Sequence, residues 1–159
     1  TMNFLTEHGI GSYGELESKL AAVSARRDIA HAEIKRIESR SAELTLVMKH
    51  AGTYRQLKPL YDRYRKSNDK EKFLRGHESE IILFEAAARE LKRLGAVPLP
   101  TTESMKTELA NLNAEKERLL AEYKAARTEA QEYDTVKQNV DALLTVPKEQ
   151  EQQRRHELE

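Results

Sequence analysis

An apolar stripe at alternating four- and three-residue steps runs along two long segments of this sequence. In the first segment it consists of Leu16, Leu20, Val23, Ala30, Ile34, Ile37, Leu44, Met48 and Ala51. In the second it consists of Met105, Leu109, Leu112, Leu119, Tyr123, Ala126, Ala130, Tyr133, Val140 and Leu144. A repeat of about 3.5 residues keeps one seam of a helix turned toward a partner helix. The stripe therefore predicts an all-α fold, a long antiparallel coiled-coil hairpin with shorter buttressing helices.

Polar residues occupy four positions of this seam: Arg27, Ser41, Lys116 and Lys137. Polar seam residues also fix the register of oligomeric coiled coils. A parallel homodimer is thus the alternative to an intramolecular hairpin, and the sequence leaves both open.

Start and stop signals divide the chain into a short N-terminal helix or turn (1–11), an elongated helical domain (12–146) and a polar tail (147–159). Ser12 and Glu15 fit a capping box. Either Asn68 or Asp69, and either Thr101 or Thr102, is suited to cap a following helix, and Gly95 to end one. These signals predict helices over about 13–51, 54–66, 70–94 and 102–145.

Two prolines set expected helix limits. The apolar register shifts by one residue after Ala51, and Gly52 and Pro59 follow. Because proline cannot donate the helical hydrogen bond, we expect a break between Gly52 and Pro59, and a helix end before Pro147.

Both ends of the chain resemble cloning remnants. Thr1 precedes Met2, and Leu158-Glu159 is a dipeptide commonly left ahead of a vector-encoded tag. We therefore expect the sequence to be a fragment of a longer protein.

The composition suits a narrow apolar seam, since 38% of the residues are hydrophobic and 34% are charged. The net charge is zero, so binding to nucleic acid requires local clustering of cations. The chain has no cysteine, which excludes disulfides and suits a reducing cytoplasm. No apolar run approaches the roughly 20 residues that span a bilayer, so we expect no membrane partner.

The sequence offers little for catalysis. Its histidines are His8, His31, His50, His77 and His156. No two of them lie one helical turn apart with a carboxylate beside them, as a helical metal site would require. The carboxylates stand beside lysines and arginines, which indicates surface ion pairs. We expect no catalytic residue, no metal, no cofactor and no small-molecule substrate, and we expect His77 to pack at a helix interface.

One segment has a composition of its own. Residues 53–77, the basic-aromatic segment, contain eight basic and three acidic residues, interleaved with aromatic rings. Cations neutralise phosphates and rings stack on unpaired bases, so this mixture is typical of nucleic-acid surfaces. The alternative is that the tyrosines pack inward and the cations are merely solvated. The candidate nucleic-acid or partner-binding residues are Tyr54, Arg55, Lys58, Tyr61, Arg63, Tyr64, Arg65, Lys66, Lys70, Lys72 and Arg75.

The run TYRQLKPLYDRYRKSNDKEKFLRGHESEIILFEAAARELKRLG (53–95) resembles the C-terminal region of relaxase/mobilisation-nuclease proteins from integrative conjugative elements of Firmicutes. The flanking runs NFLTEHGIGSYGELESKL and EYDTVKQNVDALL resemble that region too. The resemblance implies a parent protein that nicks and carries one DNA strand, using a catalytic tyrosine and a histidine-hydrophobic-histidine metal motif in an N-terminal domain. No His-x-His triplet occurs here, so no tyrosine of this chain takes that role.

The leading hypothesis is a non-catalytic helical accessory region of a conjugative relaxase in the bacterial cytoplasm. It would assist DNA mobilisation by contacting single-stranded or transfer-origin DNA, or mobilisation and secretion-coupling proteins. The second hypothesis is a purely structural coiled-coil spacer or dimerisation module that binds no nucleic acid.

Overall fold

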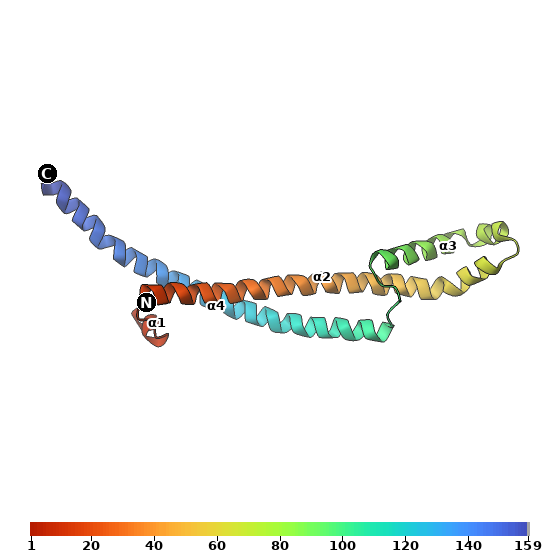
Figure 1. The fold of residues 1–159 in the computed structure, drawn as a ribbon, viewed down its shortest axis with the longest axis horizontal. Coiled ribbons are helices and arrows are strands. Elements are labelled where there is room, and N and C mark those ends of the chain that lie inside the picture. The colour runs from red at the N-terminus through yellow and green to blue at the C-terminus, as the bar shows by residue number, and fades with distance from the viewer. Residues whose placement is uncertain (159) are drawn as a thin grey trace. The chain divides into compact units, whose positions relative to one another are not determined.

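All regular secondary structure in residues 1–158 is helical, which confirms the all-α prediction (Figure 1). The computed structural model describes these residues, with the backbone alone for 146–149. Glu159, the last residue of the expected tag remnant, lies outside them. The helices are α1 (Met2–Glu7), α2 (Tyr13–Lys66), α3 (Lys70–Arg93) and α4 (Thr102–Leu158). The chain forms two compact units, a first unit of Thr1–Ile34 with the chain from Glu117 onward, and a second unit of Lys35–Lys116.

The start of α2 follows the predicted capping box in part. Ser12 Oγ accepts a hydrogen bond from the Glu15 backbone N–H at 3.2 Å. The Glu15 carboxylate reaches back to the N–H of Gly11, at 2.7 Å, one residue earlier than a capping box requires. Two backbone donors at the helix start are satisfied in this way.

Three other predicted helix limits are confirmed. Asp69 caps α3 by accepting from the Lys72 N–H at 3.1 Å, and Thr101 caps α4 by accepting from the Ser104 N–H at 3.1 Å. Gly95 follows α3 with a φ of 71°, a left-handed conformation in which glycine has no steric penalty. The next residue, Ala96, donates its N–H to the carbonyl of Leu91 at 2.9 Å, which is a Schellman-type helix end.

The expected break between Gly52 and Pro59 is absent, because α2 is one helix from Tyr13 to Lys66. Pro59 removes a single donor, and packing on either side holds the helix in place. Ala51 is fully buried, and the rings of Tyr54 and Tyr61 stack on Phe84 of α3. Tertiary contacts therefore outweigh the local preference for a break.

Two further helix limits differ from the prediction. α4 continues through Pro147 to Leu158, since the glutamate- and glutamine-rich tail is composed of helix-forming residues and Arg155 lies 3.5 Å from Glu151 one turn away. α3 is interrupted at His77, whose φ of −136° and ψ of 24° are not helical.

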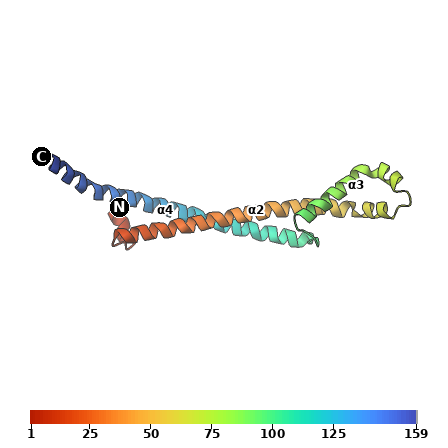
Figure 2. The same ribbon diagram turned by 45° about the horizontal axis from the view of Figure 1, so that its top comes forward.

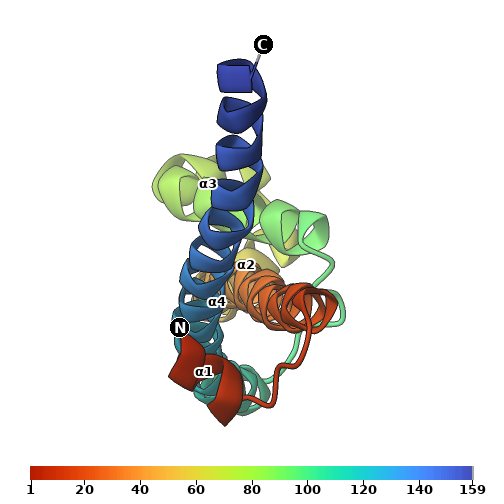
Figure 3. The same ribbon diagram turned by 90° about the vertical axis from the view of Figure 1, so that its left-hand side faces the viewer.

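In the first unit, α1 and the opposing stretches of α2 and α4, the helices labelled in Figure 3, share one apolar cluster of side chains. Its buried members are Leu16, Val23, Ala130, Tyr133 and Val136. Phe4 of α1 contacts the ring of Tyr133 edge-on, with ring centroids 5.0 Å apart. At the margin of this unit Arg26 pairs with Glu129 at 3.6 Å.

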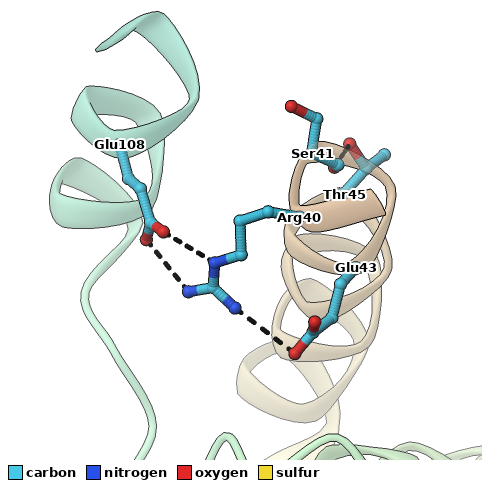
Figure 4. A network of polar contacts seen from close by, with 5 residues as sticks. All are labelled: Arg40, Ser41, Glu43, Thr45 and Glu108. Carbon is cyan, nitrogen blue, oxygen red and sulfur yellow. Dashed lines mark hydrogen bonds and ion pairs between the residues drawn. The ribbon is translucent and has the colours of Figure 1, made fainter. Parts of the chain in front are cut away.

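In the second unit, α2 lies beside both α3 and the start of α4 (Figures 1 and 2). Arg40 of α2 binds both carboxylate oxygens of Glu108 on α4, at 2.7 and 3.2 Å, and also reaches Glu43 (Figure 4). Lys116 of α4 pairs with Glu38 of α2 at 3.4 Å. Arg40, the later of the two α2 residues, thus pairs with Glu108, the earlier of the two α4 residues.

The predicted seams coincide closely with the buried residues. In the first segment all predicted positions are buried except Leu20 and Met48, which are half-buried. In the second, Leu109, Tyr123 and Val140 are half-buried, and Leu144 is exposed. Val47 and Val136 are buried without having been predicted.

Candidate nucleic-acid interface

The basic-aromatic segment forms the end of α2, the turn after it and the start of α3, all within the second unit. Its cationic and aromatic side chains differ in exposure. All eight basic residues are exposed, whereas Tyr54, Tyr61, Tyr64 and Phe73 are half-buried. The two halves of the predicted surface therefore have different surroundings.

The aromatic side chains form a continuous series of ring contacts between α2 and α3. Phe84, buried on α3, stacks against Tyr54 at 4.8 Å and against Tyr61 at 4.3 Å between ring centroids. Tyr64 lies 5.8 Å from Tyr61 and 6.0 Å from Phe73. These rings join the two helices, which matches the alternative in which the tyrosines pack inward.

His77 completes this series at the interruption of α3. Its ring lies 4.6 Å from that of Phe73, and its Nδ1 lies 3.6 Å from the carboxylate of Glu80. Both neighbours lie on α3 itself, so the expected packing of His77 at an interface between helices stays a prediction.

Four of the eight cations have partners within the chain. Arg55 donates to Thr102 Oγ1 at 2.8 Å and to the carbonyl of Pro100, so it holds the connector before α4. Lys58 binds Asp62 at 3.0 Å, and this hydrogen bond raises the pKa of the lysine. The Arg63 guanidinium lies 6.0 Å from the centre of the Phe73 ring, and Arg75 donates to the carbonyl of Glu71 at 3.4 Å.

The other four cations, Arg65, Lys66, Lys70 and Lys72, flank the turn between α2 and α3. Within the described part of the chain their side chains have no hydrogen bond or ion pair. Two acidic residues lie among them: Asp69 accepts from the backbone of Lys72 as the cap of α3, and Glu71 is exposed in the first turn of that helix. We call these four side chains the basic turn.

The helix dipoles favour the positions of only two of the four cations in the basic turn. Arg65 and Lys66 lie in the last turn of α2, where the negative end of the dipole favours cations. Lys70 and Lys72 lie in the first turn of α3, where the positive end favours acidic residues. Two lysines therefore stand where helix stability alone would not put them.

Sequence reasoning located the cations but omitted Phe84 from the site. The ring of Phe84 stacks on the rings of two candidate residues, Tyr54 and Tyr61. Its separation from Tyr54 and Tyr61 along the chain means that no local pattern reveals the contact.

Among the side chains described in residues 1–158, no group of three or more His, Asp or Glu is arranged to hold a metal ion. Nor does any helix in that range have an apolar stretch long enough to cross a membrane.

Comparison with known proteins gives no match to a protein-family model, to a curated protein or to a solved structure.

Proposed function

We propose that this chain is a helical scaffold that presents the basic turn to nucleic acid. The observation that carries the proposal is the set of four exposed cations, Arg65, Lys66, Lys70 and Lys72, without partners in the described chain. Exposed cations that are not paired internally can each neutralise a phosphate and release a counterion. Lys70 and Lys72 support a ligand role most strongly, since they oppose the dipole of their own helix.

The scaffold in this proposal is an antiparallel coiled-coil hairpin made by α2 and α4, with α3 as a buttress. The apolar seams support it, as do the ion pairs between the two helices in each unit. Arg26 pairs with Glu129 in the first unit, and Arg40 with Glu108 in the second. Such pairs at the edge of a seam favour one partner orientation.

The biological setting in this proposal rests on the resemblance of the sequence to relaxases. The chain would be a non-catalytic accessory region of a conjugative relaxase in a bacterial cytoplasm. There the basic turn would contact DNA during mobilisation, and other faces of the helices would be available to mobilisation or secretion-coupling proteins.

The test is binding of a fluorescent single-stranded oligonucleotide at increasing salt concentration. We expect measurable binding at low salt that weakens steeply as salt is added. Reversal of three cations of the basic turn, Arg65→Glu, Lys70→Glu and Lys72→Glu, should abolish it.

A matched control reverses three exposed cations of α4 in the first unit: Arg118→Glu, Lys124→Glu and Arg127→Glu. This variant has the same net charge as the first, so it should bind more strongly than the first if the effect is local. No binding by the unaltered chain at low salt, or equal loss in both variants, would contradict the proposal.

The second candidate is a structural spacer or dimerisation module. The observation that favours it is the exposure of Leu143 and Leu144 on α4, 69% and 56% respectively. Burial of these side chains against a second copy would stabilise a dimer. Sedimentation over a range of protein concentrations tests it: a dimer weakened by Leu143→Ser and Leu144→Ser supports this role, and a concentration-independent monomer excludes dimerisation.

A further inference from the structure

The aromatic rings of the basic-aromatic segment already have ring partners. Tyr54 and Tyr61 stack on Phe84, which is 5% exposed, and Tyr64 lies between Tyr61 and Phe73. Proteins that hold single strands usually stack bases on exposed aromatic faces. These contacts, which join α3 to α2, cover part of each half-buried ring and leave a base only the remainder.

Within the described residues, the side chains of the basic turn take part in no such contact between α2 and α3. Its four side chains are exposed, and its cations lie within eight consecutive residues, from Arg65 to Lys72. Long, flexible cationic side chains can follow phosphates along either a single strand or a duplex, because both carry the same charged group.

Resting on the proposed function, we infer that the basic turn binds the phosphate backbone of nucleic acid without base stacking, and so binds duplexes and single strands alike. The aromatic rings then act in folding, by joining α2 to α3. The composition of the segment favours instead a surface that stacks the unpaired bases of single strands.

The distribution of apolar side chains favours nucleic acid over an anionic membrane. Proteins that lie on membranes place exposed apolar side chains beside their cations. In the described part of the second unit, the exposed large apolar side chains are Leu46, Ile82, Leu83 and Val97, and none lies between Arg63 and Arg75.

The salt dependence has a definite expected size. If each of the four cations neutralises one phosphate, the slope of log K against log salt is about −3.6 for a duplex and about −2.8 for a single strand. Replacement of Lys70 by glutamine should make the duplex slope shallower by about one.

The experiment uses the full chain with three probes: a mixed-sequence oligonucleotide as a single strand, the same sequence as a duplex, and vesicles of anionic phospholipid. Two variants separate the roles, Lys66→Gln with Lys70→Gln for charge, and Tyr64→Leu for the ring. Circular dichroism establishes that each variant is helical.

The expected result is binding of single strand and duplex within about threefold of each other, reduced in the charge variant and unchanged in Tyr64→Leu. A single strand bound at least about tenfold more tightly than the duplex, with that preference lost in Tyr64→Leu, would overturn the inference while the proposed function stands. Binding to vesicles and to neither oligonucleotide, or to no probe, would overturn the proposed function itself.

Discussion

At the scale of single residues, the structure distinguishes side chains that the sequence presents as equivalent. Six tyrosines occur in the chain, and Tyr133 is buried while Tyr61 and Tyr64 are half-buried in ring contacts. Sequence periodicity placed Tyr133 on the seam correctly. Periodicity could not distinguish a ring that is free to contact a ligand from a ring packed on Phe84, because the contact with Phe84 joins two different helices.

The raised pKa values of two tyrosines in the first unit predict how the stability of the fold depends on pH. The pKa of Tyr13 is raised, chiefly by its hydrogen bond to the Asp141 carboxylate, and the pKa of Tyr133 is raised, chiefly by burial. A group whose pKa is higher in the folded state stabilises the fold below its unfolded pKa, about 10 for tyrosine. That stabilisation is lost as pH rises through the folded pKa.

The melting temperature of the unaltered chain should therefore fall above about pH 10. The fall should be smaller in the double variant Tyr13→Phe, Tyr133→Phe, which has no phenol to ionise at either position. Circular dichroism melts across that range measure it, and equal falls in both proteins would refute the assignment.

At the scale of elements, capping signals were predicted well and helix continuity was not. Asp69 and Thr101 begin their helices as expected, since a cap is a local feature of three or four residues. Pro59 does not end α2, because Ala51, Tyr54 and Tyr61 pack on either side of it. The contacts that hold this helix come from α3, beyond the reach of a local pattern.

Glycine replacement tests helix continuity at Gly52. A Cβ at Gly52 or at Gly95 would meet nothing within 4 Å, but Gly95 has a φ of 71° whereas Gly52 lies inside α2. Gly52→Ala should stabilise the chain by about 0.5–1 kcal/mol. Gly95→Ala should destabilise it by about 1 kcal/mol, because alanine is strained in the left-handed region. Urea unfolding measures both, and destabilisation by Gly52→Ala would indicate a break in α2.

Neighbouring residues on α3 test the packing of the aromatic rings. Phe84 is 5% exposed and Leu83 is 55% exposed. Phe84→Ala should destabilise the chain by about 3 kcal/mol, since it removes the ring on which Tyr54 and Tyr61 stack. Leu83→Ala, the matched control, should change stability by less than about 0.5 kcal/mol. Similar effects from the two variants in urea unfolding would exclude the packed arrangement.

At the scale of the whole molecule, the two units have different roles in the proposal. The first unit holds α1 against α2 and α4 through the cluster around Tyr133. The second unit places the basic turn beside rings that join its helices. Composition predicted where the cations gather, but their availability depends on which of them find partners in the fold, as Arg55 does with Thr102.

The most direct test of the central claim is to map backbone amide chemical shifts by NMR as a short DNA duplex is added at low salt. The account predicts that the shifts change chiefly for residues 63–75, the last turn of α2 and the start of α3, and that the changes reverse when salt is raised. Changes centred on α1 or on the α4 stretch of the first unit, or no change at low salt, would contradict it.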